Sequence, residues 1–380
     1  MVVRNAVRLD SRVLRIGDAL AGAGHDMVCV GYRSTPDDQP SWEVREVEGS
    51  SLAGARRLSH AALLPLARVG QGWKAAYWTD PRVRRLYEHV SATRPDVVHA
   101  HDWNTLPIAA RVANETGCRF VYDSHEFASQ ENQQSASWRL VYAPFTRAIE
   151  AQFIRRAAAV ITVSTSIAVE IQNLYELDRM PTVVRNIPDA DRLAPRPIGS
   201  RINVLYHGGV SASRGVVETA ASVADWPADF DLTIRGSIAD DLRASIERAA
   251  PPDRVSLVPA VAPGDVVRAA NSFDIGIHPS LGSSMNDEYS LPNKFFEYLD
   301  AGLALCIADF PEMATLIEMH GLGRLIARPV TPATIAAAIN GFTRERIWAY
   351  KQASHRLAET MTWAAEAEVL VGLYRERVSR

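Results

Sequence analysis

Short apolar runs alternate with stretches in which apolar residues recur at helical spacing along most of the chain. A strand-length apolar run followed by a helical stretch is the pattern of a βα unit, and repeated units predict a parallel α/β sheet. The expected strands are residues 2–7, 27–30, 96–102, 119–126, 159–163, 202–207, 230–235, 255–258, 273–278 and 303–308. The expected helices are residues 10–23, 81–92, 105–115, 138–156, 165–175, 216–223, 240–249, 265–271, 292–301, 344–357 and 364–378.

Proline residues interrupt this alternation near the middle of the chain. Pro188, Pro195 and Pro197 lie close together, and the βα pattern restarts after them. A chain of 380 residues also exceeds the usual size of one domain. We therefore expect two α/β domains joined by a proline-rich linker. The expected parts are an N-terminal domain over residues 1–188, a linker over 189–200 and a C-terminal domain over 201–361.

Composition narrows the class of protein. Hydrophobic residues make up 47% of the chain and charged residues 22%, which favours sizeable folded cores. The net charge of −3 argues against a nucleic-acid-binding protein. The three cysteines, Cys29, Cys118 and Cys306, lie in or beside apolar runs without metal-ligand spacing, which predicts buried thiols in a reducing cytoplasm. No apolar run is long enough to span a membrane.

The stretch 286–302 carries the clearest functional pattern. It begins as a polar loop after an expected strand, and Pro292 is placed to open a helix. The free N–H groups of a helix start favour an anion, and Lys294 adds a positive charge. Glu297, one turn further, can accept hydrogen bonds from a diol such as ribose. Together these features predict a nucleotide-diphosphate site; an ordinary surface helix is the alternative.

Two further segments place polar residues where ligands bind in α/β sheets. The expected strands 96–102 and 119–126 both end in histidine and carboxylate, at His101 and Asp102 and at His125 and Glu126. Ligands bind at the carboxyl ends of parallel strands, which makes His125 and Asp102 candidate functional residues. A lone histidine is more often structural.

The loop 208–215 follows the first strand of the second half. Gly208 and Gly209 let the backbone approach a ligand closely, and Arg214 at the helix start can bind phosphate in a bidentate way. A plain strand-to-helix turn is the alternative, since the loop is neither G-x-G-x-x-G nor a P-loop.

The segment 51–78 mixes apolar and basic residues. It is interpreted as a helix that packs on the sheet, with peripheral contact to an anionic membrane as the alternative. Asp189 and Asp191 in the expected linker have the Asp-x-Asp spacing of some metal-dependent sugar transferases, but we interpret them as structural, and no metal site is expected.

Four segments together resemble the GT-B-fold retaining glycosyltransferases of family 4, also called glycosyl transferases group 1. The matching segments are DVVHAHDW at 96–103, VYDSHE at 121–126, YHGGVSASRG at 206–215 and LPNKFFEYLDAG at 291–302. The resemblance implies two Rossmann-like βα domains facing a central cleft. It also implies a C-terminal helix, residues 362–380, that packs back on the N-terminal domain.

The resemblance further implies a retaining, hexosyltransferase-type enzyme that works by front-face attack without a metal or other cofactor. The C-terminal domain would bind the nucleotide sugar, with Arg214 and Lys294 neutralising the diphosphate and Glu297 holding the ribose. The N-terminal domain would bind the acceptor, with His125 near the donor sugar and Asp102 orienting the acceptor or supporting His125. The positions expected at the donor are Gly208, Gly209, Arg214, Gly215, Arg235, Gly236, Tyr289, Ser290, Leu291, Asn293, Lys294 and Glu297.

The sequence departs from the family pattern at two donor positions. Tyr289 stands where the family has a glutamate, and Gly209 where it has an arginine. The first strand and its glycine-rich loop are short as well. The missing glutamate and Gly209 motivate one alternative to a transferase, a non-catalytic GT-B partner subunit. A second alternative is a sugar-nucleotide epimerase on the same fold, which would need carboxylates placed for proton and water chemistry on the sugar.

The function expected is transfer from a UDP- or GDP-sugar to a cell-envelope glycan, a glycolipid or a secondary metabolite. A cytoplasmic enzyme is expected, with the inner membrane face as its alternative place of work. The family recognises the base through backbone groups, here near Arg235, Gly236, Val258 and Pro259. Backbone groups are the same in nearly all residue types, so the sequence does not reveal the base. The sugar, the acceptor and the oligomeric state also stay open at this point.

Overall fold

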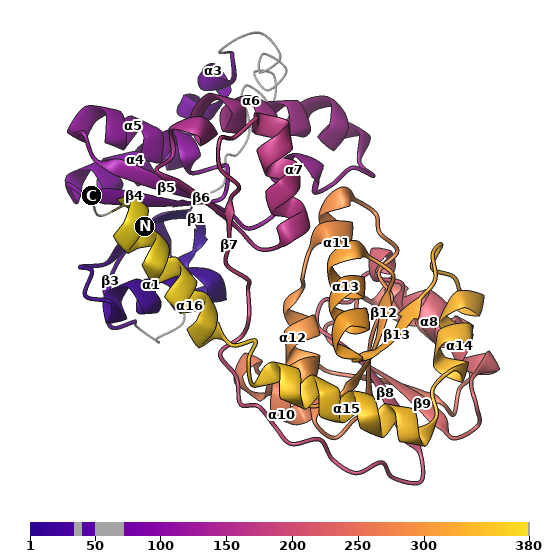
Figure 1. Cartoon of the computed structure of the whole chain (residues 1–380). Coiled ribbons are helices and arrows are strands. Elements are labelled where there is room, and N and C mark those ends of the chain that lie inside the picture. Colours follow the sequence, from indigo (N-terminus) through magenta and orange to yellow (C-terminus); the bar gives the residue numbers. More distant parts are fainter. Residues whose placement is uncertain (34–39, 50–71, 379–380) are drawn as a thin grey trace. The chain divides into compact units, whose positions relative to one another are not determined.

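A computed structural model describes residues 1–33, 40–49 and 72–378 and divides the chain into two compact units. The first unit contains Met1–Arg185 together with Ser284–Asn286 and the C-terminal segment from Glu366. The second contains Asn186–Ser283 and Asp287–Ala365. Each unit is an α/β unit with one parallel sheet (Figure 1). The expected linker, residues 189–200, has no regular secondary structure and is part of the second unit.

The first unit is built on a seven-stranded parallel sheet of order β3-β2-β1-β4-β5-β6-β7. Helices α3 to α6 pack side by side along one face, and α1 and the C-terminal segment cover the other (Figure 1). Its strands are β1 Val2–Ala6, β2 Val28–Tyr32, β3 Glu43–Val47, β4 Val97–His101, β5 Arg119–Ser124, β6 Ala159–Thr162 and β7 Thr182–Val183. Its main helices are α1 Ser11–Gly22, α3 Trp73–Thr79, α4 Pro81–Ala92, α5 Leu106–Thr116, α6 Ala143–Phe153 and α7 Thr165–Tyr175.

The second unit has a six-stranded parallel sheet of order β10-β9-β8-β11-β12-β13. Its core lies on both faces, with α8, α9 and α14 on one and α10, α12, α13 and α15 on the other. Its strands are β8 Ile202–His207, β9 Phe230–Arg235, β10 Val255–Val258, β11 Ile275–His278, β12 Ala304–Ala308 and β13 Gly323–Ile326. Its helices are α8 Val216–Ser222, α9 Asp240–Ala249, α10 Val266–Ala270, α11 Met285–Tyr289, α12 Asn293–Asp300, α13 Pro311–His320, α14 Pro332–Asn340 and α15 Arg344–Ala358.

Local chemistry explains where several helices begin. The Asp10 side chain accepts from the backbone N–H groups of Arg12 and Val13 and caps α1. Ser164 caps α7, and Thr331 and Thr334 form a reciprocal capping box at the start of α14. These caps satisfy N–H groups that have no partner inside the helix.

The structure corrects several expected elements. Two elements differ from the expected set: β3, a largely polar strand at the sheet edge, and α13, which begins at Pro311. Residues 138–156 form a π-helical turn, α6 and a 3₁₀ turn instead of one helix. Cys29 and Cys306 are buried as expected, whereas Cys118 is partly exposed.

Strand order determines where each sheet opens for a ligand. In the first unit the order reverses between β1 and β4, and in the second between β8 and β11. Helices leave neighbouring strands in opposite directions at such a point, so the backbone parts at the carboxyl ends of the strands. Asp102 follows β4 and Gly208 follows β8, so both candidate sites begin at these positions.

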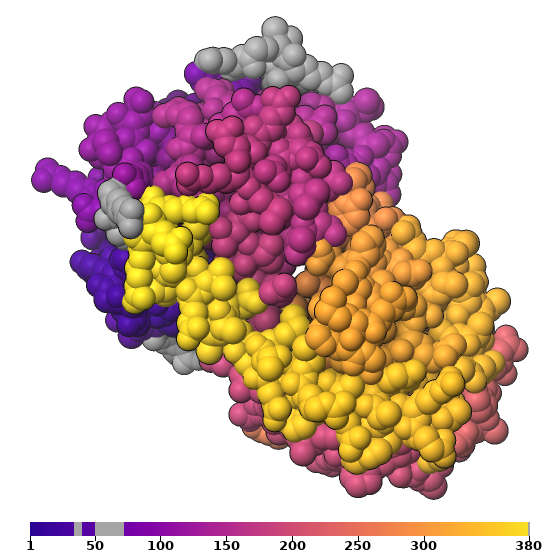
Figure 2. Space-filling model, in the orientation of Figure 1, coloured from indigo at the N-terminus to yellow at the C-terminus, as the bar shows by residue number. Residues whose placement is uncertain are grey.

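The last helix of the chain, α16 (Trp363–Leu373), continues into a π-helical turn, η9 (Tyr374–Val378). In the space-filling view these yellow residues lie against residues of the first unit (Figure 2). Glu366 accepts from the backbone N–H and the guanidinium of Arg185, at 2.7 and 2.9 Å. Tyr374 meets His99 in β4, with its hydroxyl 2.6 Å from Nδ1.

Among the described residues, no helix combines the length and the apolar composition that crossing a bilayer requires. Most of the basic segment 51–78, interpreted above as a packed helix or a membrane contact, lies outside the described residues. Its last part forms α3, where Trp73 and Tyr77 are buried.

Candidate active site

A buried cluster of histidines and carboxylates lies at the carboxyl end of β4 and β5. Side chains alternate between the two faces of a strand, so His99 and His101 share one face of β4, and Asp123 lies beside them on β5. His101 and Asp123 are partners in the strand register. Tyr122 and Ser124 point to the opposite face, where the Tyr122 hydroxyl donates to buried Glu150 at 2.6 Å.

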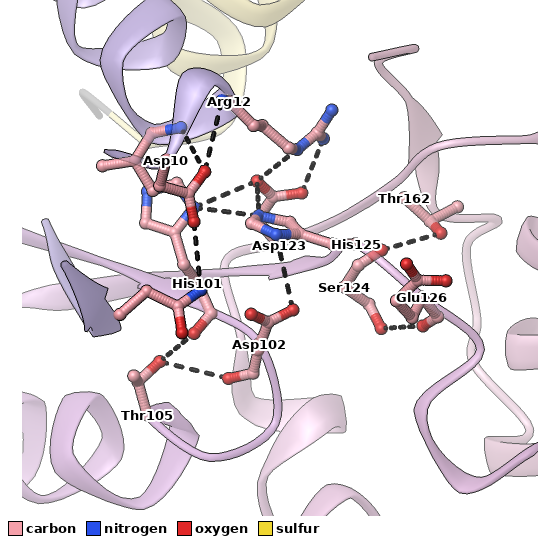
Figure 3. Close-up of polar contacts among 12 residues, drawn as sticks. Asp10, Arg12, His101, Asp102, Thr105, Asp123, Ser124, His125, Glu126 and Thr162 are labelled. Carbon is pink, nitrogen blue, oxygen red and sulfur yellow. Dashed lines mark hydrogen bonds and ion pairs between the residues drawn. The ribbon is translucent and has the colours of Figure 1, made fainter. Parts of the chain in front are cut away.

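Asp123 is the centre of this cluster (Figure 3). Arg12 from α1 donates to both of its oxygens, from Nη2 at 2.7 Å and from Nε at 3.1 Å. Oδ2 also lies 3.1 Å from His125 Nε2, 3.3 Å from His101 Nδ1 and 3.5 Å from His99 Nε2. Arg12 and Asp123 are both buried.

The two predicted residues of this unit, His125 and Asp102, are brought together. His125 Nδ1 lies 3.5 Å from Asp102 Oδ1 (Figure 3). Asp102 has a left-handed backbone, φ 65°, which asparagine and aspartate tolerate better than other side chains. Its N–H donates to the carbonyl of Asp123 at 2.9 Å, which ties the turn to β5. Both side chains remain partly exposed, unlike the rest of the cluster.

The pKa values of His125 and His101 are shifted in opposite directions. Burial lowers the pKa of His125, but the carboxylates of Asp102 and Asp123 outweigh it and raise this pKa to about 9. Burial and the neighbouring His99 lower the pKa of His101 to about 3. Burial raises the pKa of Asp102. At neutral pH the cluster therefore holds a charged His125 and a neutral His101.

His99, His101 and Asp123 are the described residues whose ligand atoms lie close enough together, within 4.8 Å, to be considered for a metal ion. Arg12 already donates to both oxygens of Asp123, so a guanidinium occupies the place that a cation would take. These residues therefore do not fit a metal, and we do not assign them as metal ligands.

The second cluster lies in the second unit, around Lys294 at the start of α12. The Lys294 side chain is only 8% exposed, and Nζ lies 4.1 Å from the centre of the Tyr206 ring. Burial and nearby Arg214 lower the pKa of Lys294 to about 7, against a smaller opposing effect of Glu297. Burial, and then the charges of Lys294 and Arg214, hold the pKa of His278, at the end of β11, well below its usual value. The neighbouring side chains of Lys294 and Arg214 are therefore suited to bind an anion.

Glycines shape the loops beside Lys294. Gly215 has a left-handed backbone, φ 69°, and a Cβ there would lie 2.2 Å from the carbonyl oxygen of Pro279. A Cβ on Gly236 would lie 2.4 Å from the carbonyl oxygen of Gly208. A Cβ on Gly209, the position where the family has arginine, would meet nothing within 4 Å. Space therefore does not explain the glycine at 209.

Glu297 lies one turn after Lys294 and faces His207, the last residue of β8. His207 Nε2 is 3.0 Å from Glu297 Oε2. The His207 ring stacks on Tyr298, with centroids 4.6 Å apart and planes 20° apart. His207 is buried and fixed by the strand, so it defines where the Glu297 carboxylate lies.

The remaining predicted donor positions also belong to the second unit. Helix α12 begins at Asn293 with Pro292 as its N-cap, one residue later than predicted, because the extended ψ of 150° at Pro292 is not helical. Tyr289 ends the short helix α11, which was expected to be loop. The Ser290 hydroxyl donates to the carbonyl of Asp287, and Leu291 is buried. Arg235 ends β9, where its guanidinium lies 5.3 Å from the ring centre of Phe273.

Several residues of the two clusters were not predicted, among them Arg12, Asp123 and His207. Asp123 and His207 lie inside the motifs 121–126 and 206–215, two residues before His125 and one before Gly208, so strand alternation was a usable signal. Arg12 carried no such signal. It meets Asp123 across 111 positions of sequence, and its place in an amphipathic helix resembles that of any surface arginine.

Several solved structures of similar fold are glycosyltransferases or complexes with UDP. Sucrose-phosphate synthase from Thermosynechococcus elongatus has a TM-score of 0.74 at 13% identity over 99% of this chain and 97% of its own. Anabaena HepE, solved with UDP and glucose, has a TM-score of 0.71 at 13% identity over 98% of both chains. WaaG, a glycosyltransferase of lipopolysaccharide biosynthesis, has a TM-score of 0.67 at 16% identity over 98% and 97%. At these identities the likeness establishes the GT-B fold, as predicted.

Sequence comparison shows which known proteins parts of this chain resemble. Residues 9–186 match the glycosyl transferase 4-like domain. This match lies within the first of the two units and extends one residue beyond it. Glycogen synthase of Mycobacterium tuberculosis is 28% identical over 227 residues, which are 57% of this chain and 53% of that enzyme. The match spans about half the length of the curated relatives.

Proposed function

We propose that the chain is a retaining glycosyltransferase that moves a sugar from a nucleotide-sugar donor to a hydroxyl-bearing acceptor. The family match and the GT-B fold support the class of reaction. The second unit would bind the donor through Lys294, Arg214 and Glu297. The first unit would contribute His125 and Asp102 and bind the acceptor.

One observation carries this proposal: Lys294 is buried, and it forms no ion pair with a carboxylate among the residues that the structure describes, although the charge of Glu297 acts on it from further away. A buried lysine is normally paired, since an isolated charge in an apolar setting is costly. Lys294 instead lies over the Tyr206 ring, beside Arg214, at the glycine loop after β8. A diphosphate would supply the missing negative charge and would lie where charge develops as the sugar leaves.

The donor is proposed to be a UDP-sugar, with a GDP-sugar as the alternative. HepE, which shares the fold, was solved with UDP-glucose, and this supports UDP as the first base to test. Metal-independent transfer is part of the proposal, because two cations, Arg214 and Lys294, can neutralise a diphosphate. The acceptor class proposed is a cell-envelope glycan or glycolipid, as WaaG acts in lipopolysaccharide biosynthesis. A secondary metabolite is the alternative acceptor. The comparisons do not favour the partner-subunit or epimerase alternatives.

The first test is a thermal-shift titration of the full chain with UDP, GDP, ADP and dTDP. A nucleotide at about 100 times its Kd adds about 2.7 kcal/mol to the stability of the folded state. We expect a shift with UDP that Lys294→Ala and Arg214→Ala each abolish. Arg248→Ala, at an exposed position of α9, is the matched control and should keep the shift. Unchanged shifts in both site variants would place the phosphates elsewhere.

The second test measures transfer with radiolabelled UDP-sugars and a panel of envelope glycans. Lys294→Ala or Arg214→Ala should cost about 2–4 kcal/mol of transition-state stabilisation, as for the loss of one preorganised donor. Nucleotide binding without turnover on any acceptor would argue for a binding protein rather than an enzyme. Product with the donor's anomeric configuration, read by NMR, would establish retention, and inversion would contradict it.

A further inference from the structure

We propose that Asp123 is a positioning residue for His125. In this proposal the Arg12 guanidinium fixes the Asp123 carboxylate, and the carboxylate holds the His125 ring in one orientation and in its doubly protonated, charged form. The inference rests on the proposed function for the importance of His125, but its geometry does not depend on any substrate.

The orientation of the Asp123 carboxylate is set by contacts other than the one with His125. The Arg12 guanidinium donates hydrogen bonds to both carboxylate oxygens, and its Nη1 donates to the carbonyl of Val184 at 2.8 Å. Bidentate guanidinium–carboxylate pairs have a defined plane, so the orientation of the Asp123 oxygens is set by α1 and by the segment after β7. Burying such a pair rarely stabilises a fold more than apolar residues of similar volume. The contact of this ion pair with a candidate functional histidine therefore points to a positioning role for Asp123.

His125 lies between two carboxylates. Nε2 is 3.1 Å from Asp123 Oδ2 and also 3.1 Å from Nδ1 of His101, and Nδ1 is 3.5 Å from Asp102 Oδ1. A carboxylate only accepts hydrogen bonds, so a ring with one carboxylate at each nitrogen needs a proton on both. A neutral imidazole would leave one lone pair facing a negative oxygen.

The surrounding groups are consistent with a positive His125. The charged groups that face it are Arg12 and Asp10 from the start of α1, Asp102 after β4 and Asp123 from β5, and the remaining neighbour is His101. The charges of Arg12 and Asp123 cancel, and so do those of His125 and Asp102 when His125 is protonated. The raised pKa of His125 and the lowered pKa of His101 agree with this assignment.

The consequence concerns the chemistry that His125 can perform. An imidazolium whose two N–H groups both face protein carboxylates cannot accept a proton. His125 therefore supplies positive charge in the proposed transfer and does not act as a general base.

The test follows the ring nitrogens of His125 by NMR in the full chain, labelled with ¹⁵N-histidine and free of substrate. His125→Gln identifies the resonance. In the wild type we expect both ring nitrogens to stay protonated to above pH 8. Asp123→Asn keeps the shape and removes the charge, and it should lower the pH of the His125 transition by more than one unit. A wild-type transition near 6.5, or the same transition in Asp123→Asn, would overturn the proposal.

Asp80→Asn is the matched control. Asp80 is a buried carboxylate of the same unit, paired with Arg4 at 2.9 Å and with Arg82 at 2.8 Å. Its loss removes a comparable ion pair and should leave the His125 transition unchanged. If Asp123→Asn fails to fold because Arg12 is left unpaired, the double variant Arg12→Met/Asp123→Asn removes both buried charges. A smaller downward shift is expected there, because Arg12 lowers the pKa of His125 while Asp123 raises it through both its charge and its hydrogen bond. An unchanged transition would equally contradict the proposal.

Because this measurement needs no substrate, its result is independent of whether the protein transfers sugars. Once a donor is identified, Asp123→Asn should lower kcat and move the alkaline limb of its pH profile downwards, with little change in donor KM. A rise in KM alone would indicate a purely structural role.

Discussion

The protonation of Lys294 depends on whether a negative charge lies beside it. Its burial disfavours the charged form, and Arg214 disfavours it further, so the amine of the free protein titrates near neutrality, with a pKa of about 7. A phosphate group beside it would reverse both effects. Binding at this residue should therefore be coupled to uptake of a proton.

This coupling predicts how donor affinity depends on pH. Below pH 7 the free amine is already charged, and UDP-glucose should bind with its full affinity. Above pH 7 binding must also protonate Lys294, so affinity should fall with rising pH, by up to about tenfold per unit. UDP-glucose is the probe because its diphosphate does not titrate between pH 7 and 9. Isothermal titration calorimetry in buffers of different ionisation enthalpy measures the proton uptake directly.

Lys294→Arg is the control, because a guanidinium stays charged at every pH used. It should bind with a pH-independent affinity and without proton uptake. Proton release by the wild type, or an affinity that rises with pH, would contradict the assigned environment of Lys294.

How far single residues could be predicted depended on the distance to their partners. Lys294, Glu297, His125 and Asp102 were selected because each follows a strand and stands in a polar segment, and the structure places each pair together within its unit. Arg12 and His207 act through partners 111 and 90 positions away, on other elements. Pairing over such distances comes from the packing of helices on the sheet, which a pattern of apolar residues does not specify.

At the scale of elements, Tyr298 replaces backbone pairing where β8 and β11 separate. The ladder between these strands ends at Leu205 and Gly276. Beyond it, the Tyr298 hydroxyl lies 3.1 Å from the Leu205 carbonyl and 3.2 Å from that of Ile277. It also accepts from the N–H of His207 at 3.2 Å. One hydroxyl from α12 therefore contacts backbone groups of both strands at the strand-order reversal, accepting from one N–H and sharing its single proton between two carbonyls.

Tyr298→Phe should accordingly destabilise the second unit by about 1–3 kcal/mol, because it leaves buried backbone groups without a partner. Urea denaturation followed by tryptophan fluorescence measures this loss. Tyr350→Phe is the control, since Tyr350 packs edge-on against Phe342 at a less buried position. Equal stability of the Tyr298→Phe variant and the wild type would show that the hydroxyl is dispensable.

Elements were more predictable than their ends. Strands β8, β9 and β10 and helices α4 and α7 have the predicted bounds, because apolar periodicity and turn residues agree there. The first turn of α12 was misplaced by one residue because proline is common at both the N-cap and the first helical position. Strand β3 escaped prediction because its Glu-Val-Arg-Glu-Val sequence lies at an edge, where one neighbour suffices to pair it.

At the scale of the whole molecule, the C-terminal segment completes the first unit although it follows the second in sequence. Leu370, Leu373 and Val378 are buried, and Glu366 and Tyr374 meet Arg185 and His99. This segment covers the face of the sheet that carries the histidine cluster.

Deletion of residues 363–380 should therefore weaken the first unit selectively. We expect the amides of β4 and β5 to lose protection from hydrogen exchange, because His99 loses its tyrosine partner and apolar surface becomes exposed. The amides of β8 and β9 serve as the internal control and should keep their protection. Equal loss in both units, or no loss in either, would contradict the assignment of this segment to the first unit.

The same feature has a consequence for the newly made chain. The ribosome releases Arg185 and His99 long before Glu366 and Tyr374, and the intervening residues take about 10–40 s at typical rates of synthesis. During that interval the first sheet lacks part of the cover of one face, where α1 is already present, while the second unit is still emerging. The nascent chain must therefore protect an unfinished apolar surface, and chaperone binding during translation should be strongest in this window.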